Sequence, residues 1–116
     1  MRLEKISLLY FSTSNFDDMR KFLVDFGFEV TENPNDKLMP AFNDGRAVRA
    51  IRGDLDFTLE ESTTGVQRAS FNVMLTGYSD EEIERIKALG YECDSQRSIY
   101  GTSHSFRTPD GGTFVL

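Results

Sequence analysis

The chain has 116 residues, of which 39% are hydrophobic and 28% charged, and its 19 acidic and 13 basic residues give a net charge of −6. This length suits one domain with a hydrophobic core and is too short for two ordinary domains. The acidic balance, with basic residues scattered along the chain, excludes nucleic acid as an expected partner.

The first twelve residues, MRLEKISLLYFS, hold only a short apolar run interrupted by charge. They therefore predict neither a signal peptide nor a membrane span, and we expect a cytoplasmic protein without a membrane partner. The single cysteine, Cys93, leaves no internal disulfide and no thiolate metal cluster. We expect it to be a small strand residue and not a catalytic thiol, because no partner base is evident.

The first half of the chain predicts a strand, a helix and further strands. Residues 6–12 are apolar or small, as in a buried strand, and apolar residues then recur at helical spacing over 16–26. Ser14, three residues before Asp17, is expected to cap the helix, and Gly27 is expected to end it. A strand follows the glycine directly.

Two more strands are expected in GRAVRAIRGD (45–54) and LDFTLEES (55–62), separated by a turn at Gly53 and Asp54. The preceding run NPNDKLMPAFND, rich in Pro, Asn and Asp, is expected to be an irregular connection. The first of these strands carries three arginines. One of them could face a cavity and bind a carboxylate, but we expect them to be solvated edge positions that discourage strand addition. They are Arg46, Arg49 and Arg52.

The second half predicts the same elements again. A strand over 69–76 precedes a helix that begins after Ser79 with three acidic residues and ends at Gly90. A strand follows, and TSHSFRTPDGGTFVL closes the chain as a hairpin that turns at 109–112.

An internal repeat accounts for this order. Shifting the chain by 63 positions aligns SLLYFSTSNFDDMRKFLVDFGFEV (7–30) with SFNVMLTGYSDEEIERIKALGYEC (70–93) without a gap. Each copy reads as βαβββ. The sequence therefore predicts an α+β protein, a single domain over residues 1–116 made of two modules, about 1–62 and 66–116.

The duplicated βαβββ order, with FLVDFGFEV after the first helix and SFRTPDGGTFVL at the end, resembles the vicinal oxygen chelate superfamily. This superfamily includes glyoxalase I, bleomycin-resistance proteins and extradiol dioxygenases. The final hairpin departs from the superfamily pattern at Thr108, where an Asp is usual. The resemblance implies two modules that form a curved mixed sheet around a central cavity, and it implies a homodimer.

The resemblance also locates the metal ligands of metal-dependent members, which are typically His and Glu on the first and last strand of each module. The matching positions here are Ser7, Thr58, Ser70 and Val115. Hydroxyl groups are poor neutral ligands and a valine side chain cannot coordinate, so we expect no metal, no cofactor and no catalytic residue. The alternative is a divergent metal-dependent lyase or isomerase that uses Glu60 and the only histidine, His104.

Strand alternation gives the expected cavity lining, a mixed surface of apolar and small polar side chains typical of small-molecule pockets. Its members are Ser7, Leu9, Phe11, Thr58, Glu60, Ser70, Asn72, Met74 and Val115, with His104 and with Tyr100 on a loop that could close over a planar ligand. The aromatic content favours a planar aromatic ligand, and the acidic groups favour a cationic one. Neither neighbouring serine, Ser103 or Ser105, can face His104, because neighbours on a strand point to opposite faces.

The function expected from the sequence is a metal-independent small-molecule-binding protein with a role in resistance, sequestration or sensing. Two alternatives stay open beside it. One is the metal-dependent enzyme just described, and the other is a protein-interaction module whose cavity is filled by its own side chains.

Overall fold

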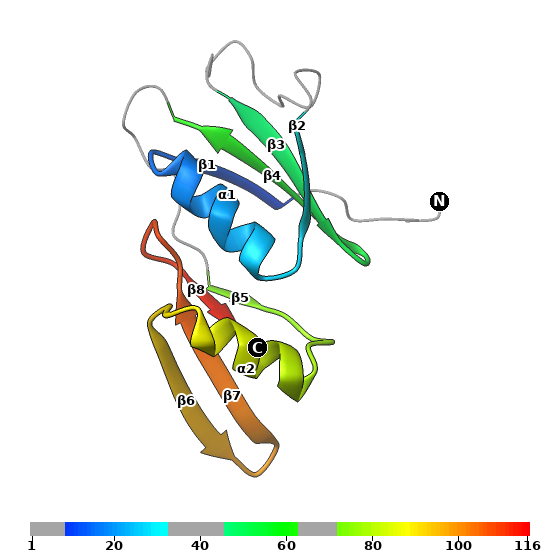
Figure 1. Cartoon of the computed structure of the whole chain (residues 1–116), viewed down its shortest axis with the longest axis vertical. Helices are drawn as coiled ribbons and strands as arrows, with labels where there is room; N and C mark the ends of the chain where they lie inside the picture. Colours follow the sequence, from blue (N-terminus) through cyan, green and yellow to red (C-terminus); the bar gives the residue numbers. More distant parts are fainter. Residues whose placement is uncertain (1–8, 33–45, 63–71) are drawn as a thin grey trace, which may run out of the picture. The chain divides into compact units, whose positions relative to one another are not determined.

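A computed structural model describes residues 9–32, 46–62 and 72–116, and the chain divides into two compact units, residues 1–69 and 70–116. The element order is βαβββ in each unit (Figure 1). Residues 63–65, between the two expected modules, and the expected irregular connection over 33–44 lie outside the described residues. The single-domain organisation stays a prediction.

In the first unit, the described residues form one mixed four-stranded sheet and one helix. Its elements are β1 (Leu9–Thr13), α1 (Phe16–Asp25), β2 (Glu29–Glu32), β3 (Ala47–Arg52) and β4 (Leu55–Glu61). The strand order is β1-β4-β3-β2, in which β1 runs parallel to β4 and the other pairs are antiparallel. The expectation that the arginines of β3 occupy an edge is wrong, because β3 pairs on both sides.

The second unit repeats this topology. Its elements are β5 (Asn72–Met74), α2 (Asp80–Ala88), β6 (Cys93–Ser98), β7 (Gly101–Arg107) and β8 (Thr113–Val115). The strand order is β5-β8-β7-β6, again with a parallel first pair and antiparallel pairs after it. The predicted α+β fold of two βαβββ modules, each with a mixed sheet, is confirmed.

The core of the first unit lies between α1 and one face of the sheet. This apolar face consists of alternate, fully buried residues of the two central strands, namely Val48, Ala50, Phe57 and Leu59. The predicted helical stripe of Phe16, Met19, Leu23 and Phe26 is buried with it, and so is Phe22. The Phe28 ring, just after the helix, lies 5.0 Å from the Phe57 ring.

The two helices begin differently. The α1 N-cap is Asn15, which makes no side-chain capping bond, so the predicted cap at Ser14 is wrong; the Asn15 N–H donates instead to Thr13 Oγ1 at 2.9 Å. At α2 the Glu82 N–H donates to Ser79 Oγ at 3.1 Å, and the Ser79 N–H donates to the Glu82 carboxylate at 3.3 Å. The start of α2 is thus a complete capping box.

Replacing this cap has a measurable consequence. Ser79→Ala is expected to lower the free energy of unfolding by about 1 kcal/mol, because it leaves an N-terminal N–H of α2 without its acceptor. Urea unfolding followed by circular dichroism measures the change. Ser14→Ala is the matched control and is expected to alter stability by less than about 0.5 kcal/mol; equal effects would contradict the assigned caps.

The predicted hairpin at 109–112 is confirmed, and Thr108 organises it. The Gly112 N–H donates to Thr108 Oγ1 at 2.9 Å, while the Thr108 hydroxyl donates to Asp110 Oδ1 at 2.9 Å. Thr108 therefore stabilises the turn through its hydroxyl group. None of the helices in the described ranges has both the length and the apolar character needed to span a bilayer.

Candidate functional site

The second face of the first sheet is lined by polar side chains that are nonetheless buried. On β4, alternate residues Asp56, Thr58 and Glu60 point away from the apolar face and are 6%, 3% and 0% exposed. Ala47 and Arg49 of β3 are paired with Glu60 and Thr58 and share this side. We call these five residues the polar face.

Arg49 supplies the cation of the polar face. Its guanidinium Nη2 lies 2.5 Å from Asp56 Oδ2, and the two side chains are 37% and 3% exposed. The ion pair therefore joins a nearly inaccessible carboxylate to a guanidinium that still meets solvent. Of the three arginines considered from the sequence, Arg49 is the one that lies beside the predicted residues Thr58 and Glu60.

The backbone register of β1 does not bring all predicted lining positions together. Thr58 pairs with Tyr10 and Glu60 pairs with Ser12, whereas Leu9 and Phe11 pair with Phe57 and Leu59. The repeat alignment applied the same shift of 63 residues to the strands and to the helices. The strand-to-helix connections differ in length, however, because two residues separate β1 from α1 and five separate β5 from α2. Ser7 lies outside the described residues.

In the second unit, three predicted positions, Asn72, Met74 and Val115, occupy a common face. Asn72 pairs with Thr113 and Met74 pairs with Val115, and the Met74 side chain is 81% exposed. We call this side the Val115 face. Ser70 lies outside the described residues. Tyr100 belongs to the short turn between β6 and β7 and is 94% exposed.

His104 lies on the opposite face of this sheet. Ser105 is the β7 residue that pairs with Val115, so alternation places His104 on the side of Phe106. Its Nδ1 lies 2.7 Å from the hydroxyl of Ser95, a residue that the sequence analysis did not consider. The structure thus separates His104 from Val115 and joins it to a serine on the neighbouring strand.

The described residues do not bring the two alternative metal ligands together. Glu60 and His104 belong to different units. Within the three described ranges, no three His, Cys, Asp or Glu side chains gather closely enough to hold a metal ion. Thr58 is buried on the polar face and Val115 is half-buried, so the two described positions matching superfamily ligands carry a hydroxyl and a hydrocarbon.

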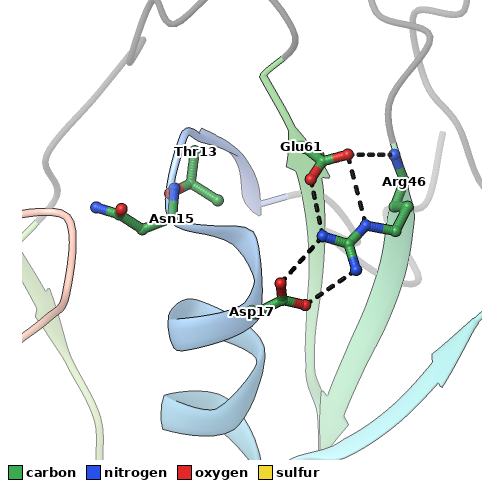
Figure 2. A network of polar contacts seen from close by, with 5 residues as sticks. All are labelled: Thr13, Asn15, Asp17, Arg46 and Glu61. Atoms are coloured by element: carbon green, nitrogen blue, oxygen red, sulfur yellow. Dashed lines mark hydrogen bonds and ion pairs between the residues drawn. The ribbon is translucent and has the colours of Figure 1, made fainter.

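A polar cluster lies where α1 begins (Figure 2). Arg46 bridges two carboxylates: its Nη1 is 2.9 Å from Asp17 Oδ1 and its Nη2 is 2.8 Å from Glu61 Oε2. The guanidinium carbon also lies 4.6 Å from the centre of the Phe16 ring. An open concavity of about 280 Å³ is lined by residues 14–18 together with Arg46 and Glu61. Arg46 thus ties the start of the helix to the ends of β3 and β4.

These contacts predict a pH dependence of stability. Hydrogen bonds from Arg46 hold the pKa of the Asp17 and Glu61 carboxyls below their ordinary values. A carboxyl with a lowered folded-state pKa contributes stability above its unfolded-state pKa, and the contribution is lost as pH falls through the folded-state value. Arg46→Met is therefore expected to destabilise the protein near neutral pH, and its difference from the wild type should shrink toward about pH 3.

Urea unfolding at a series of pH values measures this difference. The control is the same Arg46→Met change made in a chain carrying Asp17→Asn and Glu61→Gln, where its effect should not vary with pH. A wild-type difference that stays constant from neutral to acidic pH would contradict the assignment of the Arg46 contacts.

Comparison with known proteins shows similarity in structure. No protein-family model matches the chain, and no curated protein matches its sequence. Among solved structures, TnmS3, an antibiotic-binding protein from a Streptomyces species, has 20% identity and a TM-score of 0.75, with 100% of this chain and 96% of that chain covered. The fosfomycin resistance protein FosX from Listeria monocytogenes has 20% identity and a TM-score of 0.69, with 99% and 93% covered.

A lactoylglutathione lyase from Agrobacterium tumefaciens has 16% identity and a TM-score of 0.68, with 99% of this chain and 93% of that chain covered. These three proteins are described with different functions. They nevertheless share one fold with this chain over nearly its whole length. The glyoxalase and bleomycin-resistance-like fold indicated by the sequence is therefore confirmed. At such low identity the likeness concerns the fold, and function depends on the residues of the site.

Proposed function

We propose that this chain, which has the vicinal oxygen chelate fold, binds a small organic molecule on the polar face of its first sheet, without a metal ion and without transforming the molecule. The buried polar face carries the proposal. Taking carboxyl and hydroxyl groups out of water is costly unless they are hydrogen-bonded, and a sheet that needed only packing would use apolar residues, as the other face does.

The chemistry of the polar face favours a ligand with a cationic group. Two of the five residues of the polar face, Asp56 and Glu60, carry carboxyl groups and one, Arg49, carries a guanidinium, and the chain as a whole has a net charge of −6. Thr58 adds a hydroxyl that can donate or accept a hydrogen bond. A planar aromatic amine or guanidine has both properties that the sequence leads us to expect of the ligand, a positive charge and a planar aromatic ring.

The donor set supports binding without a metal. Of the superfamily ligand positions, Thr58 offers a neutral hydroxyl and Val115 offers no donor atom, while zinc and iron sites require imidazole, thiolate or carboxylate ligands. TnmS3 is described as an antibiotic-binding protein and FosX as a fosfomycin resistance protein. For this chain they support a role in resistance, sequestration or sensing.

Thermal unfolding with a panel of aromatic amines and guanidines, and with aromatic acids of the same size, tests the proposal. A cationic member is expected to raise the melting temperature in a concentration-dependent manner, equally with and without EDTA. Recovery of the unchanged molecule would show that it is not transformed. A rise that disappears in EDTA, or chemical conversion of the bound molecule, would overturn the proposal.

Glu60→Gln locates the site, because it removes one of the two carboxyl groups of the polar face while keeping nearly the same shape. It is expected to weaken binding of the cationic ligand at least tenfold by calorimetry, with circular dichroism checking the fold. Glu81→Gln, at an exposed position of α2, is the matched control and should leave the affinity unchanged. Equal affinities for both variants would place the ligand elsewhere.

A homodimer and a cytoplasmic location belong to the same proposal. Members of the superfamily commonly dimerise, and an acidic chain with one cysteine suits the cytoplasm. Light scattering on the purified protein is expected to give twice the 13.2 kDa mass of the chain.

A further inference from the structure

A pair of potentially reactive side chains lies in the second unit and shares no residue with the proposed ligand site. Ser95 of β6 is directly opposite His104 of β7, and its Oγ lies 2.7 Å from His104 Nδ1. Ser95 is exposed and His104 is half-buried. The exposed Ser95 hydroxyl makes the pair accessible from solvent, and β6 is an edge strand of the described sheet (Figure 1).

The register explains why the two side chains meet. The Arg107 N–H donates to the Glu92 carbonyl at 3.0 Å, which makes these two residues a hydrogen-bonded pair. Alternation along an antiparallel ladder then makes Ser95 and His104 a non-hydrogen-bonded pair, the kind whose side chains approach most closely. Consistently, the His104 backbone N–H and carbonyl bond to Leu116 on the other side of β7, at 3.0 and 2.8 Å.

This geometry suits the activation of a hydroxyl group. A neutral imidazole with its proton on Nε2 presents a lone pair at Nδ1, and the Ser95 hydroxyl can donate to it. A positioned base that accepts the hydroxyl proton during attack turns a serine into a nucleophile. No third residue is required for the pair to react with a good leaving group.

The edge of the sheet adds a hydrogen-bond donor. Because Ser95 occupies a non-hydrogen-bonded position, its own N–H points away from β7, toward the side on which the described sheet has no further strand. In serine hydrolases the N–H of the nucleophile itself is one of the donors that stabilise the oxyanion. The Ser95 N–H is available for the same purpose.

We propose that Ser95 and His104 form a nucleophile and base pair that reacts with activated esters of short acyl groups. Ser95 Oγ attacks the ester carbonyl carbon while His104 Nδ1 takes the hydroxyl proton. The bond from carbon to the leaving oxygen then breaks, and the leaving group departs with that proton, which leaves an acylated Ser95. A water molecule deprotonated by His104 attacks the acyl group, and the carboxylic acid leaves with regeneration of both side chains.

p-Nitrophenyl acetate is the probe that tests this reaction. The wild-type protein is expected to release a burst of p-nitrophenolate of about one equivalent per chain, and peptide mass spectrometry should find the acetyl group on Ser95. Ser95→Ala should abolish the burst. His104→Gln should slow the acylation of Ser95 about 100-fold, because it keeps a polar partner for the hydroxyl but removes the base.

Ser103→Ala is the matched control, since Ser103 lies on the same strand pair but on the other face, opposite Gln96. It should acylate at the wild-type rate. Circular dichroism confirms that all variants are folded. Acetylation confined to lysines or to His104, or a Ser95→Ala protein that reacts as fast as the wild type, would overturn the proposal. Each of these outcomes leaves the proposed ligand site of the first unit unaffected.

Discussion

Phe57→Ala is expected to lower the free energy of unfolding by about 3–5 kcal/mol. The Phe57 side chain is fully buried on the apolar face and its ring lies 5.0 Å from that of Phe28. Truncation to alanine removes the apolar transfer contribution and leaves a cavity between the sheet and α1 that rigid strands on either side of β4 cannot close. This loss is a large part of the total stability of an ordinary domain.

Urea unfolding followed by circular dichroism measures the effect. Val24→Ala on α1 is the control, because Val24 is 48% exposed and its truncation should cost less than about 0.5 kcal/mol. A loss below about 1 kcal/mol for Phe57→Ala would mean that the site collapses freely and that the apolar face is not a close-packed core.

The same experiment addresses the organisation of the chain. Phe114 is the corresponding buried aromatic of the second unit, 1% exposed on β8. If the two modules form a single cooperative domain, Phe57→Ala and Phe114→Ala should each shift one common transition. Two separate transitions, each moved by only one of the substitutions, would show that the modules unfold independently.

The fold could be predicted because its signals recur. Gly27 and Gly90 each follow a helix with a periodic apolar stripe, and both have positive φ values, 87° and 93°. A residue with a side chain is strained in that conformation, so the sequence marks both helix ends unambiguously. Two such signals at a constant spacing, followed by strand patterns, leave few arrangements other than a duplicated βαβββ unit.

The face of each strand was harder to predict than its existence. One residue of difference in a connection exchanges the two faces of a strand, and the connection from β1 to α1 is three residues shorter than that from β5 to α2. An alignment anchored on the helix-ending glycines therefore predicts the positions of the helices well, but it does not predict which β1 residues face which side of the sheet. Pairing with β4 decides that register, and the local sequence does not contain it.

Ser95 was missed for a related reason. The sequence analysis considered only the neighbours of His104 along its own strand, whereas the contact runs across to β6. The turn between β6 and β7 sets that contact: pairing of Ser98 with Gly101 around two turn residues brings Ser95 opposite His104. Gly101 signals a turn in this region, but common two-residue hairpin turns place glycine inside the turn, whereas Gly101 lies just after it, so the sequence did not contain the register.

Arginines on one strand acquired different roles through topology. Arg46, directly before β3, bridges carboxylates of α1 and β4, while Arg49 reaches the polar face from within the strand. The spacing of the arginines in the sequence is also compatible with exposed positions on an edge strand. Because β3 lies between β2 and β4, Arg49 is next to Asp56 of β4, and this makes Arg49 a constituent of the proposed ligand site.

Arg49→Met is expected to lower the free energy of unfolding by about 2–4 kcal/mol, because it leaves the nearly inaccessible Asp56 carboxylate without its guanidinium. The expected loss extends below the about 3–5 kcal/mol usual for a broken buried pair, because Arg49 is itself 37% exposed. Urea unfolding measures the loss, and Arg97→Met, at an exposed position of β6, is the control with little expected effect.

The double variant Arg49→Met/Asp56→Leu separates packing from function. Replacing a buried ion pair by apolar residues of similar size is often neutral for stability, so the double variant should regain most of the loss. If the pair is kept for ligand recognition, this stable protein should nevertheless bind the cationic ligand at least tenfold more weakly. A double variant that is both stable and fully able to bind would mean that the ion pair only fills the polar face, and that the ligand contacts other groups.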